Sequence, residues 1–309
     1  MSDTGRAADD AVDQSPPPRL PPRDPAGHKG TFGSVAILGG CCTGGLLMIG
    51  APALAARAAL RAGCGLAKVV VPEPIAAAVL QLVPSATGLT IPVDALGAYS
   101  PAQARLAVAR AVDFATVLAV GPGLGTGQGP VELALAAAEQ NRVPIVLDAD
   151  GLNAVAQAPE LREALRAHAI LTPHPGEFRR LAARLGIRGD PVDPASRPAA
   201  AAELARALSA VVVLKGQGTI VTDGTRIWRN TTGSAALATG GTGDVLTGLI
   251  AGLVSQYASA MSLFDLARVA VAAHGLACDA WCQHTHADSG LLAHELADRL
   301  PAALQRQRE

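Results

Sequence analysis

The stretch ATVLAVGPGLGTGQGPVELALAAAEQNRVPIVL, residues 115–147, contains the repeating unit of the fold. A short apolar run, Ala115–Val120, is followed by a glycine-rich loop, a helix-forming segment over Val131–Gln140 and a second apolar run, Pro144–Leu147. Short runs without polar alternation are typical of strands buried on both faces, and strands joined through a helix pair in parallel. The stretch therefore predicts one strand–helix–strand crossover of a parallel sheet.

The same alternation of apolar runs and amphipathic segments extends from Gly33 to the end of the chain. Further strands are predicted at Ser34–Leu38, Ala67–Val71, Ala169–Leu171 and Val211–Leu214, and further helices at Ala51–Arg61, Gly176–Leu185, Asp244–Ser255, Asp265–Cys282 and Gly290–Leu300. A hairpin is predicted over Thr219–Thr222 and Thr225–Trp228, because Asp223-Gly224 between them favours a tight turn. The pattern indicates one α/β domain whose mainly parallel sheet is covered by helices.

The composition excludes several classes of protein. The 309 residues are half hydrophobic and carry a formal net charge of -1, with four Phe, two Tyr and two Trp. Neither the basic surface nor the stacking aromatics of a nucleic-acid binder are therefore expected. The uncharged stretches 30–56 and 245–264 are interrupted by glycines or polar residues, which argues against membrane spans. Five cysteines without a secretory signal predict a cytoplasmic protein rather than a disulfide framework.

The N-terminal residues differ from the rest of the chain. Six prolines lie between Pro16 and Pro25, and large apolar residues are scarce there. Such a composition is typical of a disordered or polyproline-like segment. We therefore predict a disordered tail over residues 1–19 and one folded domain over residues 20–309.

The segment Thr239-Gly240-Gly241-Thr242-Gly243-Asp244 precedes a helix whose apolar positions begin at Val245. Glycines before a helix start let backbone N–H groups converge, and the helix dipole adds positive potential, which suits a phosphate. An aspartate weakens simple anion binding, but its carboxylate can take the proton from a hydroxyl that attacks a phosphate. Asp244 is therefore either a general base or the N-cap of the helix.

Two further loops lie between a strand end and a helix start, where a parallel sheet binds ligands. Gly121–Gly127 lacks the spacing of a dinucleotide-binding fingerprint, so its glycines serve either a tight turn or the close approach of a ligand. In Thr172-Pro173-His174-Pro175-Gly176-Glu177, two prolines stiffen the loop and present His174. Glu177 is either a partner of the helix dipole or part of a metal site beside a phosphate.

Only three lysines are present, and Lys215 directly follows a predicted strand in Lys215-Gly216-Gln217-Gly218-Thr219. Such a lysine either extends to solvent or faces a ligand phosphate, and the rarity of lysine here favours the phosphate. Asp148 and Asp150 follow another strand. We expect Asp150 to cap the helix from Gly151 and assign the pair a supporting role.

His274, Cys278 and Cys282 are spaced four residues apart and share one face of a predicted helix. The spacing matches no familiar zinc pattern, and small residues surround the cysteines. An apolar, buried role for the cysteines is therefore preferred over a metal site.

Several of these segments occur together, and in order, between about Leu20 and Leu300. They are Leu20-Pro21-Pro22-Arg23, His28-Lys29-Gly30, Gly50-Ala51, Gly121-Pro122-Gly123-Leu124, Leu147-Asp148-Ala149-Asp150-Gly151-Leu152-Asn153, Thr172–Glu177, Leu214-Lys215-Gly216 and Gly240-Gly241-Thr242-Gly243-Asp244. In this combination the chain resembles the nicotinamide nucleotide repair dehydratases, the ADP- or ATP-dependent NAD(P)H-hydrate dehydratases of the ribokinase-like superfamily. It departs from them in a longer, more apolar segment between Gly40 and Gly50, and in Thr232–Ala236, where Asn-Pro-Gly is commoner.

The resemblance implies a ribokinase-like three-layer α/β/α sandwich in which residues 20–309 form the catalytic domain. It implies an enzyme that returns the S-form of hydrated NADH and NADPH to NADH and NADPH, by phosphorylation of the C6 hydroxyl and loss of phosphate. Asp244 would be the base, and Ala51, Gly123, His174 and Asp244 would contact the hydrate. ADP or ATP would contact Lys215, Gly216, Gln217, Gly218, Thr219, Gly241, Thr242 and Gly243. Mg²⁺ would bridge phosphates, with Glu177 near it, directly or through water.

The resemblance also implies partners. Related proteins are often tetramers, so a homo-oligomer is expected, and an epimerase would act in trans. Neither nucleic acid nor a membrane is an expected partner. A ribokinase-like kinase for a vitamin precursor is the first alternative function, and a non-catalytic nucleotide-binding protein is the second.

Overall fold

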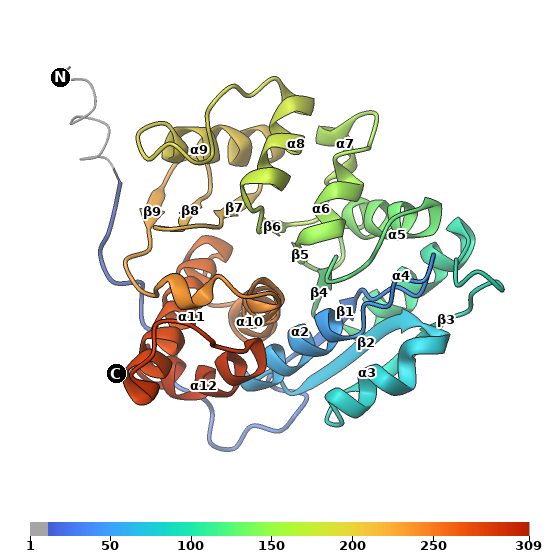
Figure 1. The fold of residues 1–309 in the computed structure, drawn as a ribbon, viewed down its shortest axis with the longest axis horizontal. Helices are drawn as coiled ribbons and strands as arrows, with labels where there is room; N and C mark the ends of the chain where they lie inside the picture. Colours follow the sequence, from blue (N-terminus) through green and yellow to red (C-terminus); the bar gives the residue numbers. More distant parts are fainter. Residues whose placement is uncertain (1–11, 309) are drawn as a thin grey trace.

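The centre of the structure is a nine-stranded sheet (Figure 1), seen in a computed structural model that describes residues 12–308. The strands are β1 (Ser34–Leu38), β2 (Leu66–Pro72), β3 (Thr87–Ile91), β4 (Val117–Val120), β5 (Ile145–Leu147), β6 (Ala169–Leu171), β7 (Val211–Leu214), β8 (Ile220–Thr222) and β9 (Ile227–Arg229). Their order is β3-β2-β1-β4-β5-β6-β7-β8-β9. Pairing is parallel from β3 to β7 and antiparallel for β8 and β9. The predicted mainly parallel sheet is confirmed.

Helices cover both faces of the sheet and make three layers (Figure 1). They are α2 (Gly50–Arg61), α3 (Ala76–Leu82), α4 (Pro101–Phe114), α5 (Gln128–Glu139), α6 (Ala149–Val155), α7 (Leu161–Ala164), α8 (Pro175–Leu185), α9 (Arg197–Leu208), α10 (Thr242–Tyr257), α11 (Leu263–Thr285) and α12 (Ala293–Gln305), with short 3₁₀ turns at η1 (Glu73–Ile75) and η2 (Ala235–Leu237). One layer holds α2, α3 and α10–α12, and the other holds α4–α9. None of the described helices is long and apolar enough to cross a membrane.

Strand β1 shows why the central strands lack polar alternation. Val35 and Ile37 point into the core on the α2 and α10 side, whereas Ala36 and Leu38 belong to the core on the α4 and α5 side. All four side chains are fully buried. A strand covered on both faces gains stability from apolar residues at every position, which is the pattern that the sequence shows.

Helices α2 and α10 pack closely because small residues line their contact. A Cβ atom on Gly248 would lie 2.0 Å from the carbonyl oxygen of Ala55, and one on Gly252 would lie 2.8 Å from that of Ala59. Only glycine permits this approach of the two backbones. The contact holds the start of α10 against the start of α2, and both starts lie at the carboxyl ends of the strands.

The strand order reverses beside β1. From β1 the chain runs outward to β2 and β3 and then returns to β4 on the other side of β1. The crevice at the carboxyl ends of strands at such a point is the usual ligand site of an open α/β sheet. The segments after β1 and β4 meet there, where the N–H of Gly40 donates to the carbonyl oxygen of Pro122 at 2.9 Å.

Strand β3 and the hairpin of β8 and β9 differ from the sequence-based prediction. Strand β3 was not predicted, because Thr87–Ile91 lies at the sheet edge with mostly exposed side chains and so lacks an apolar run. The hairpin of β8 and β9 has the loop 223–226 rather than a two-residue turn. Gly224 alone of the predicted turn pair has a positive φ.

The predicted disordered tail over residues 1–19 is wrong for its second half, and residues 1–11 lie outside the described residues. Asp13 pairs with β9 through two backbone hydrogen bonds, to Ile227 and from Arg229. The indole N–H of the buried Trp228 donates to the carbonyl oxygen of Ser15 at 2.8 Å. The guanidinium of Arg268 reaches Asp13 at 3.3 Å. These contacts come from distant segments, so local composition does not reveal them.

Candidate active site

The glycine-rich segment before α10 forms the turn that the sequence predicts, but its capping residue is Gly241. Gly241 has a φ of +92° and is the N-cap, without a side-chain cap. Asp244 is the third residue of α10, in its first turn, and makes no capping hydrogen bond. The uncapped N–H groups and the dipole of a 16-residue helix therefore remain available for an anion.

The carboxyl group of Asp244 is held partly protonated near neutral pH. Burial, together with the negative charges of Asp148 and Asp150, raises its pKa from 3.8 to about 7, against the opposing effect of Lys215. A general base is most effective when its pKa lies near the operating pH. The electrostatics of the site therefore suit Asp244 to accepting a proton from a hydroxyl group.

Lys215, just past β7, forms a buried ion pair. Its Nζ lies 2.5 Å from Asp148 Oδ1 and 3.8 Å from Glu177 Oε2. Burial alone would lower the pKa of Lys215, but these two carboxylates raise it, so the ammonium form is retained. The other oxygen of Asp148 accepts a 2.7 Å hydrogen bond from the hydroxyl of Thr247, one turn after Asp244 on α10. Asp148 thereby links β5, β7 and α10.

His174 and Glu177 form a reciprocal cap at the start of α8. The N–H of His174 donates to Glu177 Oε2 at 2.8 Å, and His174 Nδ1 accepts from the N–H of Gly176 at 2.9 Å. His174 Nε2 lies 3.2 Å from Glu177 Oε1. Burial, and then the charges of Lys215 and Arg180, lower the pKa of His174, so its ring is neutral, with the proton on Nε2. Burial raises the pKa of Glu177, although Lys215 opposes this.

A cavity of about 550 Å³ opens beside this charged cluster. Its wall contains Lys215, Gly216, Gln217, Gly218, Thr219, Thr242 and Gly243, together with residues of the 230–238 segment and of α11. The volume is typical of a site for a nucleotide-sized ligand. Seven of the eight residues expected to contact the nucleotide thus surround one cavity. The eighth, Gly241, does not line it, because a Cβ atom there would point at Leu54 and Ala293.

Two residues that the sequence did not single out as ligand-site residues support this cavity. The guanidinium of the buried Arg197 donates to the carbonyl oxygens of Leu214 and Gln217, each at 2.7 Å, and so fixes the turn after β7. His274, on α11, donates from Nε2 to the carbonyl oxygen of Thr242 at 2.9 Å. Burial lowers the pKa of His274 to about 4, so this histidine is a neutral donor that holds the start of α10.

Ala51 and Gly123 lie against each other. A Cβ atom on Gly123, whose φ is +61°, would lie 3.1 Å from the Cβ of Ala51. Gly121 serves a different purpose, because a Cβ atom there would lie 1.8 Å from the carbonyl oxygen of Asp148. Gly121 therefore permits close packing against the backbone of Asp148, whereas Gly123 packs against Ala51 at the start of α2.

The prediction for Asp150 is wrong. Helix α6 begins at Ala149 with Asp148 as its N-cap residue, and Asp150 lies within the first turn. Asp150 Oδ2 instead accepts a 2.9 Å hydrogen bond from the N–H of Gly125 and so holds the glycine loop after β4. Asp148 is 1% exposed and pairs with Lys215.

No group of three His, Cys, Asp or Glu side chains among residues 12–308 is arranged to hold a metal ion. Cys278 is buried in the core, as predicted, whereas Cys282 is only partly buried. The hydroxyl of Ser234 lies within 3.6 Å of both sulfur atoms. Glu177 and Asp148 offer carboxylates beside the cavity, but both oxygens of Glu177 face His174. A magnesium ion there would take most ligands from water and phosphate oxygens, which is its usual mode.

The layers, the strand order and the cavity beside a carboxylate define a ribokinase-like α/β protein. The structure superposes on a ribokinase-like superfamily protein from Enterococcus faecalis with a TM-score of 0.73, over 99% of this chain and 95% of that chain, at 22% identity. A model of the NAD(P)H-hydrate dehydratase family matches residues 35–302. The chain belongs to the NAD(P)H-hydrate dehydratase family.

Individual relatives agree with this assignment. The chain is 37% identical over 282 residues to the ADP-dependent (S)-NAD(P)H-hydrate dehydratase of Neisseria meningitidis, covering 89% of this chain and 85% of the relative. It is similar to the crystal structure of the ADP/ATP-dependent NAD(P)H-hydrate dehydratase of Bacillus subtilis co-crystallized with ATP/Mg²⁺, with a TM-score of 0.74, 32% identity, and 94% and 95% coverage. The bifunctional NAD(P)H-hydrate repair enzyme of Salinibacter ruber is 36% identical over 91% of this chain, which spans about half (50%) of that relative's length.

Proposed function

We propose that this protein dehydrates the S-form of hydrated NADH and NADPH at the expense of ADP or ATP. The observation that carries the proposal is the pairing of Asp244, with a pKa of about 7, with a nucleotide-sized cavity whose wall includes Lys215 and Gly243. Family membership supports the same substrates.

The proposed reaction gives Asp244 and the nucleotide the following roles. Asp244 takes the proton of the hydroxyl at C6 of the hydrated nicotinamide ring, and the oxygen attacks the terminal phosphorus of the nucleotide. The bond between that phosphorus and the bridging oxygen breaks, and AMP leaves from ADP, or ADP from ATP. Electrons of the ring nitrogen then expel phosphate from C6, and loss of a proton from C5 restores the dihydropyridine.

The protein supplies charge and position for the transfer. Lys215, Thr242 and Gly243 line the same cavity, so the N–H groups at the start of α10 and the ammonium of Lys215 would stabilise the negative charge of the transferred phosphoryl group. Ala51, Gly123 and His174 would contact the hydrate around Asp244, and His174 is kept neutral beside it. A protonated His174 would attract the phosphate after transfer, in addition to Lys215, whereas the neutral imidazole does not.

Glu177 is the residue that would hold Mg²⁺, directly or through water, because its carboxyl group is 4% exposed and lies close to Lys215. The ion would neutralise negative charge on the phosphates of the nucleotide.

An assay of products separates this function from its alternatives. We expect the hydrate of NADH, with ADP or ATP, to yield NADH absorbance and an equal amount of inorganic phosphate. A stable phosphorylated alcohol without phosphate release would instead indicate a small-molecule kinase. Firm ADP binding with no turnover of any hydrate would indicate a non-catalytic binding protein.

Some relatives are bifunctional NAD(P)H-hydrate repair enzymes, and we propose an epimerase as the functional partner of this activity. We also propose a homo-oligomer, and sedimentation of the purified protein tests this point.

A further inference from the structure

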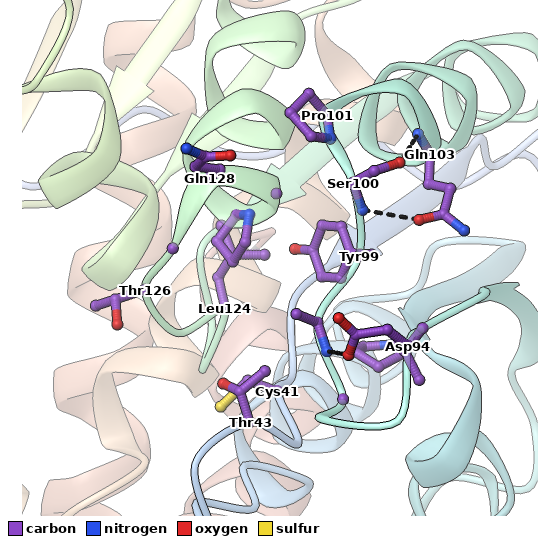
Figure 2. Close-up of a pocket in the computed structure, with 17 residues that line it drawn as sticks. Cys41, Thr43, Asp94, Tyr99, Ser100, Pro101, Gln103, Leu124, Thr126 and Gln128 are labelled. Carbon is purple, nitrogen blue, oxygen red and sulfur yellow. Dashed lines mark hydrogen bonds between the residues drawn. The ribbon is translucent and has the colours of Figure 1, made fainter.

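A second cavity, of about 560 Å³, lies at the carboxyl ends of the strands on the far side of the glycine loop after β4 (Figure 2). Its wall comes from the loop after β1, from the end of β2, from the segment between β3 and α4 with the first turn of α4, and from residues 124–130, which end the loop after β4 and begin α5. It shares no lining residue with the cavity beside Lys215. Leu124, next to Gly123, is part of its wall, so it adjoins the proposed position of the hydrate.

The chemistry of the wall excludes some ligands. No Lys, Arg or His lines this cavity, and its one charged side chain is Asp94, at the rim. The apolar part of the wall consists of Val93, Leu124 and three prolines, Pro72, Pro101 and Pro130. Flat apolar surfaces with a few polar groups suit a neutral heterocycle and its sugar rather than a multiply charged group.

Tyr99 points to a polar ligand atom. Its side chain is 6% exposed, and its hydroxyl makes no hydrogen bond to any residue in the described part of the chain. Figure 2 shows the phenol oxygen turned towards Leu124 and the side of the cavity formed by Gln128. Buried hydroxyls in proteins nearly always have a partner. The hydroxyl is enclosed in the cavity wall, so a polar atom of a ligand would complete its hydrogen bond when a neighbouring side chain such as Leu124 moves aside.

The start of α5 provides for a phosphate at the edge of the cavity. Helix α5 has 12 residues and begins after Gly127 without a side-chain cap. Its first turn offers the N–H groups of Gln128 and Gly129, since Pro130 has no N–H and the N–H of Val131 donates to the carbonyl oxygen of Gly127. A pyrophosphate placed there would connect a nucleoside in the cavity with a nicotinamide riboside beside Ala51 and Asp244.

We infer that this cavity binds the ADP half of the hydrated dinucleotide, with the adenosine inside it and the pyrophosphate at the start of α5. The inference rests on the proposed function for the identity of the substrate. Asp94 then favours one of the two dinucleotides, hydrated NADH, over the other, hydrated NADPH. Its Oδ1 accepts hydrogen bonds from the N–H groups of Leu96 and Ala98, which leaves Oδ2 for a ribose hydroxyl. A carboxylate and the lack of any lining cation disfavour a 2′-phosphate, so hydrated NADH is preferred over hydrated NADPH.

The test measures binding of ADP-ribose, which has the ADP half but no nicotinamide. The protein is first saturated with a non-hydrolysable ATP analogue, so that the cavity beside Lys215 is filled, and ADP-ribose is then titrated by calorimetry. The variant Thr126→Trp places a bulky ring in the second cavity from an exposed position. Thr225→Trp, at an exposed position in the β8–β9 loop, is the matched control.

We expect Thr126→Trp to weaken ADP-ribose binding by about tenfold or more and Thr225→Trp to leave it unchanged. The wild-type protein should bind ADP-ribose about fivefold more tightly than its 2′-phosphate. Asp94→Asn, whose amide oxygen can still accept from Leu96 and Ala98, should remove that difference. Equal binding to the wild-type protein and Thr126→Trp, or no binding at all, would overturn the inference. Because no turnover is measured, failure of the proposed reaction would be seen separately, in the product assay.

Discussion

Replacement of Asp244 by asparagine should stabilise the fold while it removes the proposed base. The raised pKa of Asp244 means that its charged form is less favourable in the folded than in the unfolded protein. As pH rises above 3.8 the unfolded state ionises first, so the folded state loses stability between that pH and about 7. Asparagine has the same shape and no such penalty.

The size of the effect follows from the two pKa values. With 3.8 unfolded and about 7 folded, the penalty is about 4 kcal/mol at pH 8, about 1.5 kcal/mol at pH 5 and close to zero near pH 3. For a chain of 309 residues, the penalty at pH 8 corresponds to a rise in Tm of about 6 °C in the variant.

Thermal unfolding followed by circular dichroism at pH 5 and pH 8 measures this difference. The gain of Asp244→Asn over the wild-type protein should be clearly larger at pH 8 than at pH 5. Asp288→Asn, at an exposed carboxyl group, is the control and should change Tm at neither pH. An increase in Tm that is the same at both pH values, or a decrease in Tm at pH 8, would refute the raised pKa of Asp244 and its partial protonation near neutral pH.

Three further predictions concern the same cluster. The value of kcat/KM should rise about tenfold between pH 6 and pH 8 as Asp244 ionises, and a flat profile would contradict its assignment as the base. Asp150→Asn should shift this rise to lower pH, because the charge of Asp150 raises the pKa of Asp244. Lys215→Met leaves the carboxylate of Asp148 buried without its cation, so it should lower the free energy of unfolding by about 3 kcal/mol. It should also weaken ADP binding. An unchanged midpoint of urea unfolding would contradict the stabilising role of the ion pair. Glu177→Gln keeps an acceptor for the N–H of His174 but loses the negative charge of the carboxylate. The turnover rate of this variant should therefore saturate at a higher MgCl₂ concentration than that of the wild-type protein. The same dependence on MgCl₂ in both proteins would contradict a role for Glu177 in the metal site.

The core of the fold could be predicted because its signal is local. Ser34–Leu38, Ala169–Leu171 and Val211–Leu214 are strands with the predicted bounds, since a strand buried on both faces has an uninterrupted apolar run. Helix α12 illustrates the opposite case. It was predicted to end at Leu300 but continues through Pro301 to Gln305, because packing of Ala303 and Leu304 into the core outweighs the cost of the proline.

The site was predicted in part, for a related reason. Segments such as Lys215–Thr219 can be recognised from the sequence, because glycines and a rare lysine follow the end of a strand. Asp148 does not, because its importance comes from a lysine and a threonine that lie far away in the sequence. His274 was considered only with its neighbouring cysteines, and its contact with Thr242 depends on how α11 packs beside α10. Long-range pairing of this kind becomes visible only in three dimensions.

The most direct test of the account is the turnover of Asp244→Asn with the hydrate of NADH, measured together with its affinity for ADP. If Asp244 takes the proton from the attacking hydroxyl, kcat should fall by about three orders of magnitude while the Kd for ADP stays within about threefold of the wild-type value. A variant that still turns over the hydrate at near the wild-type rate would contradict the assignment of Asp244 as the base.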